Sequence, residues 1–356
     1  MITPDFERIR KAVAHEEPDR VPLIEALVEY PIQSKFLGRE VTDDDLEAQV
    51  EFWASAGYDY IPLVVGMMTP GKVTENSSIS RIIRDRLAKS ANANDDRSWN
   101  LEYTSFIEDR RSFELFPWEE AAAVDISKFE RVKDLLPPGM KVIAISGKIY
   151  TLSWMLMGFE NFAASMLTDE QLVLDIMSKV AEIQIDSAER VLGLPHVGAV
   201  WAVDDIAAGT GTMISPQALR KYLFPWYRKL AALCHHAGKM FFYHSDGDMI
   251  PVIEDLIELG VDALHPIDPT AMDIVEIKEK YGDRLCLFGN VDTELLRSGG
   301  TAEIEAEVKR LLCKVSSGGG FCLGSGNSVP SWADIDNYKT MLQTVMKYGR
   351  YPILCE

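Results

Sequence analysis

The strongest constraint on the fold is a regular alternation of short apolar runs with amphipathic helical segments along most of the chain. Each run has the length of a buried strand, and a helical spacing of apolar residues follows before the next run. About eight such runs alternate with helices, which is typical of a (β/α)8 TIM barrel, and a doubly wound open sheet is the alternative. The predicted strands cover residues 21–26, 58–65, 141–146, 198–203, 240–243, 263–264, 285–288 and 320–323.

The domain organisation follows from the length and from one break in this pattern. A barrel of this class often fills a chain of 356 residues, so we predict a single α/β domain over residues 1–356. The alternation is lost across residues 72–138, where charges are scattered among short alternating pieces. We interpret this segment as an insertion after the second strand that covers the barrel mouth, with a surface excursion that contacts no ligand as the alternative.

Composition excludes several classes of partner. The chain carries 36 Lys and Arg against 55 Asp and Glu, a formal net charge of -19, so it lacks the basic surface that nucleic acids or anionic membranes require. Its five cysteines include no Cys-x-x-Cys pair, which favours reduced thiols over a disulfide framework. No signal-peptide core or bilayer-length apolar run occurs. We expect a soluble cytoplasmic protein, and assembly into a homo-oligomer is compatible with the sequence.

Polar side chains gather where the predicted strands end. In the stretch KMFFYHSDGD, an apolar run gives way to His244 and Asp246, which point the same way because strand side chains alternate with period two. This pair could form half of a metal site or an acid/base pair, and a strand-end Asx turn is the structural alternative. The carboxyl ends of parallel strands meet on one face. Other strand ends contribute Glu25, Asp204, Asp205, His265, Asn290, Asp292, Ser325 and Asn327.

Candidate roles can be assigned to these residues. We predict catalytic roles for His244, Asp246, Asp204 and Asp205, with one of the two adjacent aspartates facing the substrate and the other free to cap a turn. Metal ligation is predicted for His244 and Asp246, with His265 as a third nitrogen ligand and Cys322 as a thiolate ligand. The alternatives are helix capping for Asp246, a rim hydrogen bond for His265 and core packing for Cys322. The predicted substrate contacts are Glu25, His265, Asn290, Asp292, Ser325 and Asn327, and for Glu25 a solvated surface position is the alternative.

These stretches together resemble the uroporphyrinogen decarboxylase superfamily, which includes the decarboxylase and zinc-dependent, corrinoid-linked methyltransferases. The resemblance covers nearly the whole chain and is weak across residues 72–138. It implies a (β/α)8 barrel with its site at the carboxyl ends of the strands. The stretches that carry it are DRVP from Asp19, DDIAAGTGTMISPQALRKYLFPWYRKL from Asp204, HSDGD from His244, FGNVD from Phe288 and FCLGSGNSV from Phe321.

Within the superfamily, the resemblance is closer to the methyltransferases than to the decarboxylase. The decarboxylase binds a substrate with many carboxylates through arginines near its first strand, whereas residues 28–38 here read VEYPIQSKFLG. The decarboxylase's aspartate at the end of the second strand has no counterpart in the sequence VVGM from Val64.

The metal ligands implied by the resemblance differ from those of the thiol-methylating enzymes. Those methyltransferases hold zinc with a His-x-Cys pair and a distant cysteine in a Gly-Cys-Gly turn. Here His244 is kept, and Asp246 and Ser325 stand at the two cysteine positions. Histidine and carboxylate leave zinc a harder, more electrophilic centre, which would better polarise the ether oxygen of a methoxy compound.

The resemblance therefore implies a methyltransferase of the O-demethylase type. It would move a methyl group between a small methoxylated or methylated compound and the cobalt of a partner corrinoid protein, with zinc assisting. Two alternatives stay open: a decarboxylase or other lyase acting on a small acid, and a non-catalytic barrel that binds a corrinoid or another tetrapyrrole.

Overall fold

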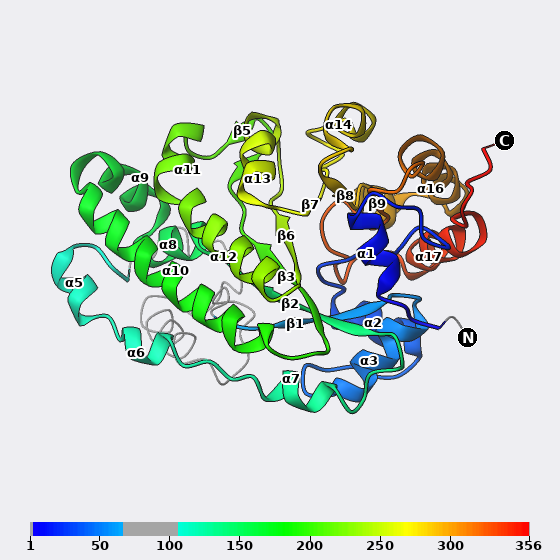
Figure 1. Ribbon diagram of the computed structural model, residues 1–356, viewed down its shortest axis with the longest axis horizontal. Coiled ribbons are helices and arrows are strands. Elements are labelled where there is room, and N and C mark those ends of the chain that lie inside the picture. The colour runs from blue at the N-terminus through cyan, green and yellow to red at the C-terminus, as the bar shows by residue number, and fades with distance from the viewer. Residues whose placement is uncertain (1–2, 67–105, 356) are drawn as a thin grey trace.

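A computed structural model describes residues 3–66 and 106–355 of the chain. Its centre is a curved, parallel, seven-stranded sheet in the order β1-β2-β3-β6-β7-β8-β9, surrounded by helices (Figure 1). Spatial order follows chain order, so the TIM-barrel-like architecture predicted from the alternation is confirmed. The strands are β1 (Tyr60–Val64), β2 (Lys141–Ser146), β3 (Val197–Val203), β6 (Met240–His244), β7 (Ala263–His265), β8 (Cys286–Phe288) and β9 (Phe321–Cys322). A separate antiparallel pair, β4 (Ala207–Ala208) and β5 (Gly211–Thr212), follows β3.

The helices form the outer layer, and many begin at an aspartate or serine that accepts a first-turn backbone N–H. At the start of α11, for example, the Ser215 hydroxyl accepts from the N–H of Ala218 at 3.2 Å, and Pro216 takes the first helical position. The helices are α1 (Glu7–Val13), α2 (Tyr30–Leu37), α3 (Leu46–Ser55), α5 (Arg110–Leu115), α6 (Trp118–Ala121), α7 (Ser127–Val132), α8 (Tyr150–Met157), α9 (Phe159–Thr168), α10 (Glu170–Leu192), α11 (Pro216–Tyr222), α12 (Phe224–His236), α13 (Ile253–Leu259), α14 (Ile274–Tyr281), α15 (Thr293–Ser298), α16 (Thr301–Val315) and α17 (Ile335–Tyr348), with a 3-10 turn at Ile250–Val252.

The predicted first strand, residues 21–26, is an extended segment rather than a regular strand. It meets β9 through a single bridge, Leu23 to Leu323, because Pro22 has no backbone N–H to extend the ladder. On its other side, the Tyr60 hydroxyl hydrogen-bonds both the N–H and the carbonyl of Glu25 at 2.5 Å. Seven strands in one curved sheet, one extended segment and the Tyr60 side chain thus take the place of the eight regular strands that were expected.

An aromatic layer fills the barrel interior below the carboxyl ends of the strands. Trp201, Phe242 and Phe288 are fully buried, with ring centroids 4.9 to 5.9 Å apart. Trp201 and Phe242 are paired across β3 and β6, so they point to the same side of the sheet. His244 lies two residues beyond Phe242 and therefore also points inward, above this layer.

The described part of the predicted insertion, residues 106–138, runs along the outside of the barrel from α10 toward α3 (Figure 1). Arg110 of α5 pairs with Asp175 of α10 at 2.5 Å, and Lys128 of α7 pairs with Asp43 at 2.8 Å. The rest of the predicted insertion, residues 72–105, lies outside the described residues.

The prediction that all cysteines are reduced is wrong for one pair. Cys313 of α16 is joined to Cys355 in a disulfide across 42 residues of sequence, with 5.5 Å between the Cα atoms. The prediction missed this pair because spacing along the chain does not reveal that the tail returns to α16. Cys234, Cys286 and Cys322 are free and buried. None of the helices in the described ranges is both long and apolar enough to cross a membrane.

A buried aspartate ties the start of the chain to the barrel. Asp59, immediately before β1, accepts hydrogen bonds from Arg8 at 2.7 Å and from Arg20 at 3.2 and 3.3 Å. It also accepts from the backbone N–H of Asp5 at 2.9 Å. Arg8 reaches a second carboxylate, Asp19, whose side chain is 65% exposed.

Replacing Asp59 by asparagine should lower the free energy of unfolding by about 3–5 kcal/mol, because two largely buried guanidinium groups would lose their shared counter-charge. Asp19→Asn is the matched control and should cost less than about 1 kcal/mol, since that ion pair is exposed on the aspartate side. Urea unfolding measures both changes. Equal losses in the two variants would contradict the role assigned to Asp59.

Candidate functional site

Three donor groups converge at the carboxyl ends of β3 and β6. The ligand atoms of Asp205, His244 and Asp246 all lie within 4.8 Å of one another. His244 Nε2 is 3.5 Å from Asp205 Oδ1 and 3.7 Å from Asp246 Oδ1. His244 is paired with Val203, the last residue of β3, so the two strands deliver these side chains to one point. The structure therefore brings together three of the residues predicted to be catalytic.

The fourth, Asp204, points the other way, because consecutive residues leave an extended chain on opposite sides. It is fully buried, and its carboxylate accepts from the backbone N–H groups of residues 149–151 at 2.6 to 2.9 Å. The Tyr227 hydroxyl also donates to it. Asp204 thus caps the start of α8, and Asp205 is the member of the pair that faces the site.

Burial and mutual charge separate the protonation behaviour of these groups. Burial alone would lower the pKa of His244, but Asp205 and Asp246 beside it raise the pKa above its ordinary value. Burial works against ionisation of Asp205, yet the hydrogen bond and charge of His244 hold its pKa down at about 2. Burial and the charge of Asp205 raise the pKa of Asp246 to about 6. A site with one firmly ionised and one readily protonated carboxyl group suits either metal binding or acid/base chemistry.

His265 lies against His244 and outside the three-residue group. Its Nδ1 is 2.7 Å from Nδ1 of His244, and the two rings are stacked with centroids 5.0 Å apart. Full burial, together with the neighbouring His244, lowers the pKa of His265 well below its ordinary value, so this ring is neutral. Its Nδ1 is already engaged, so the structure places His265 behind the group of donors.

One oxygen of the group is unsatisfied. Asp246 Oδ1 is buried without a hydrogen-bond partner, while Oδ2 accepts from Asn327 Nδ2 at 2.6 Å. A buried carboxylate oxygen without a partner is unusual unless water or an ion fills the gap. One imidazole nitrogen and two carboxylates could hold a zinc ion and leave a position open. The chemistry of the donors and the orphaned oxygen therefore both fit a divalent metal.

Glu25 and Ser325 form a second buried polar contact at the seam of the barrel. Glu25 accepts from the Ser325 N–H and from its hydroxyl, both at 2.7 Å. Because the carboxyl group is fully buried, its pKa is raised to about 8 despite these two bonds. The alternative of a solvated surface glutamate is therefore wrong.

Three further predicted residues make their contacts outside the group of donors. Asn290 donates to the carbonyl of Ile267 at 2.6 Å and holds the turn after β8. Asp292 caps α15 through the N–H of Glu294 at 2.8 Å. Cys322 on β9 is buried beside Cys286. The charges of Asp59 and Arg20, two residues that precede β1 in the chain, act on its thiol. The structure does not bring Cys322 to His244.

Sequence reasoning missed Lys148. Its positive charge helps to keep Asp205 ionised and opposes the protonation of His244, although the two carboxylates beside the ring outweigh it there. The residue follows Gly147 directly after β2, so the strand-end rule that found the other residues applies to it as well.

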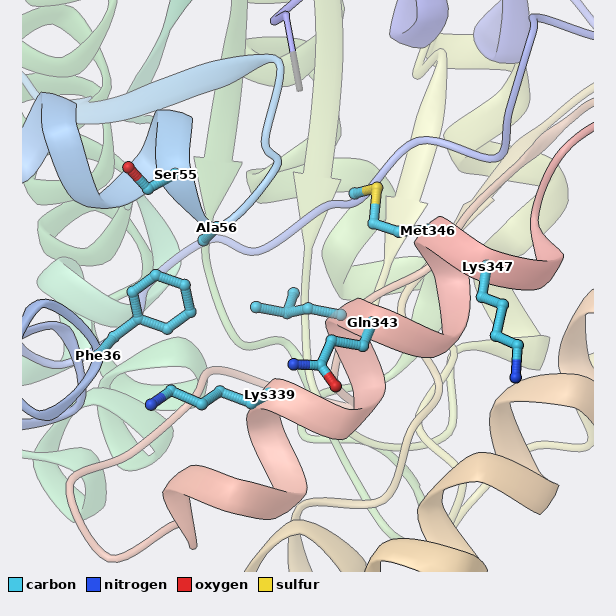
Figure 2. A pocket seen from close by; sticks show the side chains of 8 residues that line it. Phe36, Ser55, Ala56, Lys339, Gln343, Met346 and Lys347 are labelled. Atoms are coloured by element: carbon cyan, nitrogen blue, oxygen red, sulfur yellow. The ribbon is translucent and has the colours of Figure 1, made fainter. Parts of the chain in front are cut away.

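A hollow of about 600 Å³ lies elsewhere, on the outer layer between α2, α3 and α17 (Figure 2). None of its lining residues belongs to a strand end, so it is separate from the group around His244. They are Phe36, Ser55, Ala56, Lys339, Leu342, Gln343, Met346 and Lys347.

Comparison with known proteins gives the same family as the resemblance in sequence. Residues 120–348 match the sequence model described as Uroporphyrinogen decarboxylase (URO-D). Uroporphyrinogen decarboxylases of Neisseria meningitidis serogroup C and Neisseria gonorrhoeae are 25% identical over 186 residues, 49% of this chain and 49% of theirs. The chain thus spans about half the length of the curated relatives it matches.

A solved structure of a methyltransferase from Methanosarcina mazei is similar over 96% of this chain and 98% of its own, with a TM-score of 0.67 and 16% identity. At that identity the similarity establishes the shared fold.

The two adjacent aspartates should respond differently to substitution. Asp204→Asn should lower the free energy of unfolding by about 2–4 kcal/mol, because buried N–H groups at the start of α8 would face an amide that cannot accept from all of them. Asp205→Asn should change the free energy of unfolding by about 1 kcal/mol or less. It should weaken zinc binding by more than about 100-fold, because loss of a residue that supports a metal ligand already costs about 10–100-fold. Urea unfolding and chelator competition measure the two effects, and a reversed pattern would contradict the assignment.

The buried Glu25 should give the protein a pH-dependent stability. An acid whose pKa rises from 4.5 unfolded to about 8 folded keeps more protons bound in the folded state across that window, so stability falls as pH rises. The slope from this group is at most about 1.4 kcal/mol per pH unit. Glu25→Gln preserves the contact with Ser325 without titrating, so its unfolding free energy should lose this slope. Parallel pH profiles for the two proteins would show that Glu25 is ionised in the fold.

Proposed function

We propose, from the premise that this chain belongs to the uroporphyrinogen decarboxylase family, that it is a methyltransferase of the O-demethylase type. Its substrates are a small methoxylated or methylated compound and a partner corrinoid protein, whose cobalt accepts or donates the methyl group. The observation that carries the proposal is the convergence of one imidazole and two carboxylates at the strand ends. The shared fold with a methyltransferase from Methanosarcina mazei supports it.

We propose zinc as the cofactor, held by Asp205, His244 and Asp246. When bound, zinc supplies a Lewis acid that polarises an oxygen of the methyl donor. Asp205 contributes a carboxylate that stays ionised, because its pKa is about 2. Asn327 donates to Oδ2 of Asp246 at 2.6 Å, which leaves Oδ1 of Asp246 for the metal, on the side of His244 and Asp205. Three protein ligands leave a position for the substrate oxygen.

The remaining contribution of the protein is to position the reactants. The cobalt of the partner protein would supply the electron pair for the new carbon–cobalt bond, and the pair of the broken carbon–oxygen bond would stay on the donor oxygen. The aromatic layer of Trp201, Phe242 and Phe288 fills the barrel beneath the site, so the reactants would approach from the mouth. Holding the donor methyl group against a docked corrinoid would make methyl transfer a unimolecular step within one complex, in place of a bimolecular reaction in solution.

A decarboxylase acting on a small acid is the second candidate, and the identity with the Neisseria decarboxylases favours it. It predicts release of carbon dioxide without any corrinoid. Residues 28–38 contain no arginine, and Val64 stands at the end of β1 with 50% of its surface exposed, so a polycarboxylate substrate lacks partners there.

A non-catalytic corrinoid binder would instead retain tight binding of the corrinoid after replacement of both His244 and Asp246.

The proposal is tested by mixing the protein with reduced corrinoid protein and a panel of methoxyarenes, and following methyl–cobalt formation by absorbance. We expect methylation with at least one donor. His244→Ala should slow it by about 100-fold or more, because the ion that polarises the donor oxygen would be lost. His235→Ala is the control, since that histidine lies on α12 and pairs with Asp262 on the outside of the barrel. Absence of methylated corrinoid with every donor would refute the proposal.

A further inference from the structure

We propose that His265 is a positioning residue that fixes which nitrogen of His244 carries a hydrogen, and so directs the free nitrogen at the metal. The inference rests on the proposed zinc site. Its first test, however, needs neither metal nor methyl transfer.

The contact between the two histidines requires one hydrogen. Their Nδ1 atoms are 2.7 Å apart, a distance at which one nitrogen must donate and the other accept. The opposite nitrogen of His244, Nε2, is the one that faces Asp205 and Asp246 at 3.5 and 3.7 Å. The state of the Nδ1 contact therefore decides what His244 can offer on the metal side.

The His265 ring is held rigidly in the orientation that makes this contact. The Trp201 ring packs against it edge-on, at an interplanar angle of 87° and a centroid distance of 5.0 Å. On another side, the backbone of Gly289 packs close to the His265 ring. A Cβ added to that glycine would lie 3.3 Å from Cδ2 and 3.4 Å from Nε2 of His265. The backbone carbonyl of His265 accepts from the N–H of Ser245 at 3.0 Å, which fixes the His265 backbone beside β6. A fully buried ring confined in this way has little freedom to turn its Nδ1 elsewhere.

Only one placement of the hydrogen suits metal binding. With the hydrogen on His244 Nδ1, the His244 Nε2 lone pair is free for an ion, and His265 acts as acceptor. With the hydrogen on His265, neutral His244 would carry its own hydrogen on Nε2, which would block ligation. Metal-binding histidines commonly donate their second N–H to a neighbouring acceptor, which fixes the ring and its tautomer. His265 supplies that acceptor as a neutral imidazole.

The first test is 15N NMR of the histidine side chains in the metal-free protein, at a pH high enough that His244 carries a single ring hydrogen, with His265→Asn used to assign the pair. We expect the hydrogen of the contact on Nδ1 of His244. The second test is zinc affinity, measured with zinc alone against a chromophoric chelator. His265→Leu removes the acceptor and should weaken zinc binding by about 10–100-fold. His265→Asn places an amide oxygen near the position of Nδ1 and should restore most of the affinity, which a purely space-filling role would not do.

Three results would overturn the inference: the hydrogen found on His265, wild-type zinc affinity in His265→Leu, or equally weak binding in the Asn and Leu variants. Unfolding of each variant in urea separates a folding defect from a binding defect. If the histidine contact and the zinc affinities behave as expected but no methylated corrinoid forms, the proposed function alone fails.

Discussion

The parallel register of β3, β6 and β7 is the constraint on which the candidate site depends. Val203, His244 and His265 form one row across the three strands. Asp205 and Asp246 each follow a member of this row by two residues and face the same side of the sheet. A slip of one residue along β3 would turn Asp204 inward in place of Asp205 and remove a capping group from α8.

This arrangement leaves polar groups buried without partners. Within the described part of the chain, Asp246 Oδ1 and Trp201 Nε1 are buried and make no hydrogen bond. Such groups are costly in a folded protein unless a ligand or water satisfies them. Asp246 Oδ1 lies within the group of donors, where the pKa of Asp205 is lowered and that of Asp246 is raised, and this combination indicates a site organised for a bound ion or substrate.

The architecture and the inner part of the site could be predicted from local patterns. Short apolar runs indicate strands, and period-two alternation with a parallel sheet places His244 and Asp246 on one face. Contacts between distant segments could not be predicted in this way. The burial of Glu25, the hydrogen bond from Tyr60 to the Glu25 backbone and the link between Cys313 and Cys355 depend on where remote parts of the chain return. Asp204 and Asp205 could not be distinguished because their roles depend on where β3 ends, and strand ends are poorly defined by propensity.

The central claim is that these strand ends present one imidazole and two carboxylates to a single divalent ion. X-ray absorption at the zinc edge of the zinc-loaded protein tests it most directly. We predict a shell of nitrogen and oxygen scatterers at about 2.0–2.2 Å with the multiple-scattering signal of one imidazole. Two imidazole signals, or a sulfur scatterer at about 2.3 Å, would contradict it, because His265 or Cys322 would then have to bind the ion.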